Sequence, residues 1–302
     1  MRAAVIKQLF DHAGRRKDIF LVTGDAGFGV LDTFRDRFPR RFLNLGVAEQ
    51  NMIGFSAGLA LSGYKVFIYN IIPFLLYRCY EQVRNDICYQ RLPVTLIGIG
   101  SGVTYAPQGV THYSIEDIAV ARTMPGLAIL SPSDPLEAAA CLEYAVKAKG
   151  PVFIRLAKSG EACLHGRPVK DISRPIVLAE GAKVAVLFHG SVSCEVAAAV
   201  KLAGHAVRVI SLPCLVPLNG EALSDRLRGI ETAITVEEHF VEGGLGTIVT
   251  EWAATQRRPP KIKRLGIANE YIHHIKNNAG MRAHYGINAA SVAQAIKDAF
   301  HE

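Results

Sequence analysis

Residues 41–67, RFLNLGVAEQNMIGFSAGLALSGYKVF, contain a strand-like run, a helix of small residues and a second strand-like run. We expect the first strand at 42–45, the helix at 51–62 before Gly63, and the second strand at 66–70. Glu49 is the one acidic residue in this apolar segment. The helix dipole favours a carboxylate in the first turn, which is a purely structural explanation. A buried carboxylic acid can also hold or share a proton, so Glu49 is a candidate catalytic group.

The alternation of strand and helix continues on both sides of this segment. The run VTLIGI at 94–99 is apolar throughout, as expected for a parallel sheet covered on both faces. This rhythm predicts a doubly wound α/β domain over residues 1–160. The further strands are expected at 19–23, 127–130 and 152–156, and the helices at 74–89, 115–122 and 136–148.

The rhythm stops in a polar, proline-bearing and turn-rich stretch, which we interpret as a linker over 161–182. Strand-like and helical runs then resume over 183–302. The predicted fold class is therefore α/β, with two doubly wound, mainly parallel-sheet domains of which the second is smaller.

Composition narrows the function classes. The 302-residue chain is half apolar and carries a dispersed net charge of +7. Its densest basic stretch, 257–264, has no interleaved aromatics, so nucleic acid is not expected as a partner. No apolar run reaches the roughly 18–20 residues of a membrane span, and the amphipathic N-terminus does not resemble a secretion signal. Six scattered cysteines without a C-x-x-C pair suggest reduced thiols and a cytoplasmic location.

Three aromatic residues recur at a spacing of three in the predicted helix 74–89. Phe74, Tyr77 and Tyr80 would line one side of an α-helix. Such a stripe is usually part of a core, but it can also form a platform for a flat heterocycle.

Five segments together carry a resemblance to a known family. In this order along the chain, they resemble the C-terminal half of a transketolase, including its C-terminal domain. The segments are GVAEQNM (46–52), PFLLYRCYEQVRND (73–86), QGVTHYSIEDIAVARTMPGLAILSPSD (108–134), GPVFIRL (150–156) and TVEEHFVEGGLGTIVTEW (235–252).

The resemblance implies a cofactor site on this chain. Glu49 matches the glutamate that hydrogen-bonds N1′ of the aminopyrimidine ring of thiamine diphosphate. Phe74 matches the aromatic residue that stacks on that ring, and Tyr77 and Tyr80 match the aromatics beside it. The cofactor supplies the electron sink, while the protein supplies orientation and one acid.

The resemblance also implies substrate contacts. His112 matches a substrate-facing imidazole, and Arg155 matches the arginine that grips a phosphate of the acceptor sugar. Arg78 is a second anion candidate, and Asp25 matches an aspartate near the mouth of the site. Without the resemblance, His112 could be a structural histidine, Arg155 a partner in an ion pair, and Asp25 a residue that satisfies backbone amides in a glycine turn.

Two positions depart from the family pattern. Gln108 stands where the family has an aspartate for the donor sugar, and Gly100 stands where it often has a phosphate-contacting histidine. An amide can donate and accept hydrogen bonds but carries no charge. The identity of donor and acceptor is therefore left open.

The diphosphate-binding half of the family is not recognised in this sequence. The family holds its metal ion with a Gly-Asp-Gly sequence and a later Asn. Gly24-Asp25-Ala26 with Asn51 downstream has alanine at the third position of that motif. We therefore expect no metal ligand on this chain. A separate N-terminal transketolase subunit would hold the diphosphate with Mg²⁺ or Ca²⁺, in an α2β2 assembly whose site lies at the interface.

The sequence thus predicts the C-terminal subunit of a split, transketolase-like enzyme. It would transfer a two-carbon ketol unit from a ketose-type donor to an aldehyde acceptor. One alternative is a pyruvate-using relative, either the β subunit of a 2-oxoacid dehydrogenase first component or a deoxyxylulose-phosphate-synthase-like enzyme. Another is a non-catalytic half-transketolase that only binds or regulates a partner.

Overall fold

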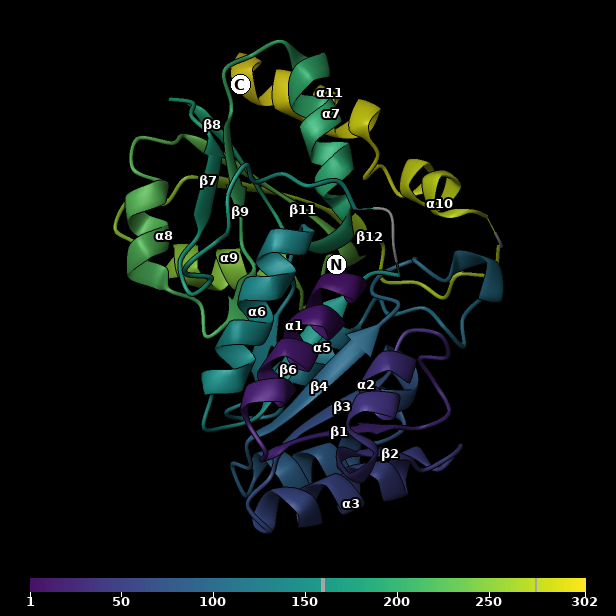
Figure 1. Ribbon diagram of the computed structural model, residues 1–302. Helices are drawn as coiled ribbons and strands as arrows, with labels where there is room; N and C mark the ends of the chain where they lie inside the picture. Colours follow the sequence, from purple (N-terminus) through teal and green to yellow (C-terminus); the bar gives the residue numbers. More distant parts are fainter. Residues whose placement is uncertain (159–160, 275) are drawn as a thin grey trace.

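The computed structural model describes residues 1–158, 161–274 and 276–302. The chain forms two sheets, each covered by helices on both faces (Figure 1). Both are mainly parallel, which confirms the predicted fold class.

The first sheet carries the segments singled out in the sequence. Within the described residues it has the strand order β10-β5-β6-β4-β3-β1-β2, in which β10 is Cys214–Val216. Its parallel strands are β1 (Ile19–Thr23), β2 (Phe42–Asn44), β3 (Lys65–Ile71), β4 (Val94–Ile99), β5 (Ala128–Leu130) and β6 (Val152–Leu156). The buried β3 and β4 lie at its centre, because their runs are apolar on both faces.

Helices cover the two faces of this sheet. α1 (Arg2–Arg15) and α6 (Pro135–Lys147) pack together on one face. α3 (Glu49–Leu61) packs on the other, where Met52, Ile53 and Ala57 are buried. The short helices α2 (Asp32–Arg37) and α5 (Asp117–Arg122) follow β1 and β4 in sequence.

The second sheet has the order β12-β11-β8-β9-β7 within the described residues. α7 (Ser193–Ala203) and α11 (Ala289–His301) pack against each other over one face, while α8 (Gly220–Arg226) and α9 (Leu245–Ala254) contribute to the core on the other. α10 (Asn278–His284) precedes α11. The strands are β7 (Ile176–Ala179), β8 (Val184–Phe188), β9 (Arg208–Ser211), β11 (Thr232–Phe240) and β12 (Lys261–Ile267).

Two short strands were not predicted. β7 lies within the expected linker and pairs antiparallel with β9 at the edge of the second sheet. β10 (Cys214–Val216) leaves the second domain and pairs antiparallel with β5 of the first sheet. Both are too short for a periodic pattern and sit among polar or proline-bearing neighbours. The boundaries 1–160, 161–182 and 183–302 remain our proposal for the domain division.

The predicted helix over 74–89 is wrong in its geometry. The chain forms π-helical turns η2 (Pro73–Tyr77) and η3 (Val83–Cys88) around the short α4 (Tyr80–Gln82). A π-turn bonds residue i to i+5 and is wider than an α-turn. The regular spacing of an α-helix therefore does not hold along this segment.

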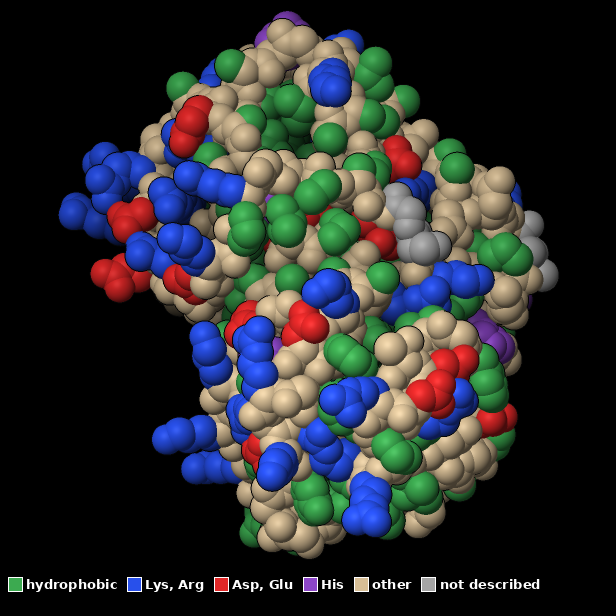
Figure 2. Space-filling view, viewed as in Figure 1, with side chains coloured by type: hydrophobic (Ala, Val, Ile, Leu, Met, Phe, Trp, Pro, Cys, Tyr) green, Lys and Arg blue, Asp and Glu red, His purple; other side chains and the backbone are tan. Residues whose placement is uncertain are grey.

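The distribution of basic side chains and the state of the cysteines can be compared with the composition of the chain. Figure 2 shows Lys and Arg side chains on both halves of the visible face, with their densest group at one edge of the upper domain. All six cysteines are free, and burial raises the pKa of Cys79, Cys88 and Cys214 to about 12. Among the described helices, none has the length and apolar character needed to cross a membrane.

Candidate active site

Four of the predicted site residues form one chain of contacts. The Glu49 carboxylate lies at the start of α3, is 6% exposed, and accepts a hydrogen bond of 2.8 Å from Arg78. The Arg78 guanidinium lies 4.5 Å above the centroid of the Phe74 ring. The His112 ring meets Phe74 edge-on, with centroids 5.3 Å apart. The structure therefore brings a buried acid, a cation, an aromatic face and an imidazole together.

The parallel sheet explains why residues so far apart in sequence meet. Glu49 follows β2, Phe74 and Arg78 follow β3, and His112 follows β4. The carboxyl ends of parallel strands lie at the same edge of a sheet, where ligands of open α/β folds bind. Oγ1 of Thr111 lies 2.8 Å from Nδ1 of His112, which fixes the imidazole orientation locally.

The hydroxyl groups of Tyr77 and Tyr80 have different surroundings. Tyr77 is half-buried, but its hydroxyl oxygen is enclosed. Desolvation of this hydroxyl and, secondarily, the nearby Asp117 carboxylate raise the pKa of Tyr77 well above its usual value. Its hydroxyl has no hydrogen-bond partner within the part of the chain that is described. The Tyr80 hydroxyl lies 2.8 Å from Oγ1 of Thr123 instead. Neither contact excludes these rings from the cofactor site, so the roles of Tyr77 and Tyr80 beside Phe74 remain predictions.

Asp25 and Gln108 lie on exposed loops at the same edge of the sheet. Asp25 follows β1 with φ of 55°, a left-handed conformation, and its backbone N–H donates to Oδ1 of Asn44 at 2.8 Å. Gln108 ends the short turn Ala106–Gln108. Neither side chain is hydrogen-bonded to Glu49 or His112 among the described contacts, and their substrate roles remain predictions.

Arg155 does not fit its predicted role. Its side chain is only 1% exposed, and its Nε donates to Asp117 at 2.7 Å. Its NH2 group donates to two backbone carbonyl oxygens. A guanidinium enclosed in this way does not face an open substrate site, so the phosphate contact predicted for Arg155 is wrong.

Lys158 is a basic residue at this edge that the sequence did not single out. It follows β6, is exposed, and places Nζ 5.4 Å from the ring centroid of Tyr105. The Tyr105 ring in turn lies 6.0 Å from the His112 ring. Its position two residues beyond the end of β6 was the signal available in the sequence.

The residues present fit the pyrimidine end of a thiamine cofactor. One Glu49 oxygen pairs with Arg78, while the other accepts no hydrogen bond among the described residues. The Phe74 ring is half-buried and adjoins this acid through Arg78. The described residues contain no group of three or more His, Cys, Asp or Glu side chains arranged for a metal ion.

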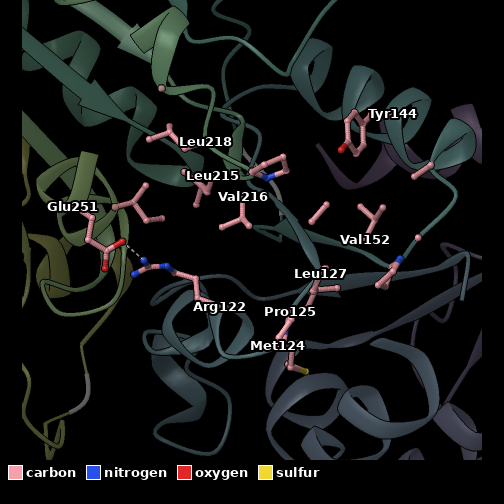
Figure 3. Close-up of a pocket in the computed structure, with 18 of the residues that line it drawn as sticks. Arg122, Met124, Pro125, Leu127, Tyr144, Val152, Leu215, Val216, Leu218 and Glu251 are labelled. Carbon is pink, nitrogen blue, oxygen red and sulfur yellow. Dashed lines mark hydrogen bonds and ion pairs between the residues drawn. The ribbon is translucent and has the colours of Figure 1, made fainter. Parts of the chain in front are cut away.

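A hollow lies at the edge of the first sheet opposite to Glu49 and His112. It has a volume of roughly 900 Å³ and lies between the domains, at the amino ends of β5 and β6 (Figure 3). Leu127, Val152 and Leu215 are among its mostly apolar lining residues. None of the predicted site residues lines it, so we do not identify it with the candidate active site.

Comparison with known families decides the assignment. Residues 1–160 match the family described as "Transketolase, pyrimidine binding domain", and residues 175–292 match "Transketolase, C-terminal domain". The chain belongs to the transketolase family. With this membership comes dependence on thiamine diphosphate as the cofactor of a transferase.

Transketolase relatives that match nearly the whole chain include separate subunits. The chain is 39% identical over 276 residues to one subunit of the apulose-4-phosphate transketolase of Actinobacillus succinogenes, covering 90% of this chain and 89% of the relative. A solved structure described as "Split gene transketolase, inactive beta4 tetramer" matches with a TM-score of 0.89 at 29% identity, covering 99% of this chain and 98% of that one.

A second group of relatives is longer. The 1-deoxy-D-xylulose-5-phosphate synthase of Caldanaerobacter subterraneus subsp. tengcongensis is 31% identical, covering 98% of this chain but 48% of the relative. The present chain thus corresponds in length to the separate transketolase subunits and to about half of the synthase.

Proposed function

We propose that this chain is the C-terminal subunit of a thiamine-diphosphate-dependent transketolase of the split type, acting in carbohydrate metabolism. It transfers a two-carbon ketol unit from a ketose-type donor to an aldehyde acceptor. The observation that carries the proposal is the contact chain from Glu49 through Arg78 and Phe74 to His112.

Each of the four residues in this series of contacts has a defined role. The free oxygen of Glu49 would hold a proton at the pyrimidine nitrogen, while Arg78 balances the charge of the other oxygen. Phe74 offers its ring to the flat heterocycle. His112 holds or donates a proton at a substrate oxygen. When bound, thiamine diphosphate supplies the electron sink that the side chains lack.

The substrate side of the site combines one cation with one neutral amide. Lys158 is exposed at the carboxyl edge of β6 and can bind an anionic group of the acceptor. Gln108 is exposed on the same loop as His112 and can hydrogen-bond donor hydroxyl groups. Asp25 borders the mouth from the β1 side. These three side chains favour a phosphorylated sugar with several hydroxyl groups over a small keto acid, which offers a single carboxylate and no hydroxyl groups.

A partner subunit completes the site in this proposal. Phe55 and Leu61 of α3 are 40% and 64% exposed, and Val47, two residues before Glu49, is 76% exposed. Gly54 and Gly58 lie on the same exposed side of α3 and allow close backbone approach. We infer that an N-terminal transketolase subunit docks here, brings the diphosphate site with Mg²⁺ or Ca²⁺, and assembles as α2β2 in the cytoplasm.

The decisive experiment compares this chain, the partner subunit and their mixture by calorimetry with thiamine diphosphate and Mg²⁺. We expect tight cofactor binding only by the mixture, followed by ketol transfer. A Glu49→Gln complex should still assemble and bind cofactor, but its turnover should fall by on the order of 100-fold or more because proton exchange is lost. Cofactor binding by this chain alone would contradict the split-site proposal.

The same assay separates the alternatives. The likeness to 1-deoxy-D-xylulose-5-phosphate synthase makes pyruvate the donor to test against ketose phosphates. Turnover with pyruvate, but not with ketose phosphates, as the donor would assign the chain to that branch. A complex that forms but binds no thiamine diphosphate would support the non-catalytic module.

A further inference from the structure

The loop that carries His112 rests on the second domain. This loop, residues 100–116, is closed at its base by two backbone hydrogen bonds between Gly102 and Ser114, of 2.9 and 3.0 Å. The next residue, Ile115, accepts a hydrogen bond of 2.7 Å from the backbone N–H of Phe240, at the end of β11. An apolar cluster joins the same surfaces through Val103, Ala106, Tyr113 and Ile115 on one side and Ile267, Ile272, Met281 and Ile287 on the other.

Arg155 lies directly beneath this base. Its Nε donates to Oδ2 of Asp117 at 2.7 Å, and its NH2 donates to the carbonyl oxygens of Ser114 at 3.0 Å and Glu238 at 2.8 Å. One guanidinium therefore links β6, the start of α5, the closed base of the loop, and β11 of the second domain.

The arrangement depends on the shape of arginine. Arg155 and Asp117 are 1% and 0% exposed, so their charges must be balanced and hydrogen-bonded within the protein. The planar guanidinium reaches three acceptors in fixed directions, whereas the single ammonium of lysine does not reproduce this fork. A buried ion pair of this kind contributes little net stability compared with apolar packing, which suggests a role in fixing geometry.

We propose that Arg155 is a positioning residue that clamps the base of the 100–116 loop onto the second domain and so sets the place of His112. The second domain, which supplies none of the proposed cofactor contacts, thereby determines where the substrate-facing imidazole lies. This inference rests on the proposed function only for the role of His112.

Arg122 offers a matched control at the opposite edge of the domain interface. It also links the two domains, through a hydrogen bond of 3.1 Å to the carbonyl oxygen of Gly243 and an ion pair with Glu251 (Figure 3). It does not touch the 100–116 loop through any hydrogen bond among the described residues. A variant at this position tests domain docking without disturbing the clamp.

The first test is hydrogen exchange on the whole chain, which does not depend on activity. Arg155→Lys should speed exchange of the Gly102 and Ser114 amides at least tenfold, while Arg122→Lys leaves them unchanged. A second variant, Gly102→Ala, disturbs the same contacts without changing Arg155. Gly102 has a φ of +61°, which disfavours alanine, and the added Cβ would collide with the Glu238 side chain. It should loosen the same amides. Unchanged exchange in both clamp variants would overturn the proposal.

The second test is a double-variant cycle in the complex with the partner subunit. Arg155→Lys should lower kcat by on the order of 10- to 100-fold with a smaller change in KM, because misplacing a catalytic group mainly affects the chemical step. In a His112→Ala background the same substitution should cost little more. Equal losses in both backgrounds, or an equal loss from Arg122→Lys, would show that Arg155 does not act through His112. An inactive wild-type complex would refute the proposed function but leave the exchange result to decide the clamp.

Discussion

At the scale of single residues, Lys158 is the sharpest test of substrate chemistry. Replacing it with methionine keeps most of the length of the side chain but removes the cation that lies beside Tyr105. We expect KM for a phosphorylated acceptor to rise roughly tenfold, because a charge-assisted contact to phosphate is lost, with little change in kcat. Steady-state kinetics of the complex with varied acceptor measure this.

Lys149 supplies the control for that substitution. It is an exposed lysine at the opposite edge of the same domain, where it lines the interdomain hollow. Lys149→Met should leave KM unchanged. If Lys158→Met also left KM for the phosphorylated acceptor unchanged, the anion would have to be bound elsewhere.

Arg155 and Lys158 show what a single sequence can and cannot predict about a site. The segment containing Glu49 predicted a buried acid at a helix start correctly, because the acid and its apolar flanks are adjacent in sequence. The two basic residues lie close together in sequence, yet one is buried and one exposed. Arg155 lies inside β6 and contacts Glu238, whereas Lys158 lies beyond the end of β6 at Leu156. The local sequence pattern predicts neither the end of the strand nor the contact with Glu238.

At the scale of elements, the strand runs were predictable and the segment 74–89 was not. Continuous apolar runs identified β3 and β4, since both faces of these strands are buried. The π-turns of η2 and η3 keep the same apolar residues but change the turn width. Hydrophobic spacing of three and four cannot distinguish such turns from a regular α-helix, so the sequence predicted one regular helix here.

The start of α6 yields a stability prediction. Asp134 is fully buried, and its Oδ1 accepts the N–H groups of Leu136 and Glu137. Its Oδ2 accepts those of Leu164 and His165, which ties the linker to the helix. Asp134→Ala should lower the free energy of unfolding by about 2–4 kcal/mol, since a cap is lost and linker amides lose their partner.

Asn288 gives a comparison for this effect in urea unfolding. It caps α11 through a single hydrogen bond to the Ser291 N–H. Asn288→Ala should cost about 1 kcal/mol, the usual value for an N-cap. Equal losses in the two variants would mean that the linker contacts of Asp134 add nothing. Protease cleavage within 161–182 should also accelerate only in Asp134→Ala.

At the scale of the whole molecule, the sequence predicted two domains but not how they interlock. β10 crosses from the second domain to pair with β5, and Phe240 reaches back to Ile115. These contacts join residues that are far apart along the chain, so local propensity cannot contain them. They explain why the division into domains is less clean in space than along the chain.

The last prediction concerns assembly with the partner subunit through the exposed face of α3. Phe55→Asp combined with Leu61→Asp should weaken binding of the partner subunit by on the order of 100-fold or more, because charges would be buried in an apolar interface. The matched control is Leu202→Asp, on an exposed position of α7 in the second domain. Calorimetric titration with the partner subunit measures both, and circular dichroism verifies the fold. Undiminished binding by the α3 variant would move the docking surface away from α3, and loss of binding in Leu202→Asp would place it on the second domain.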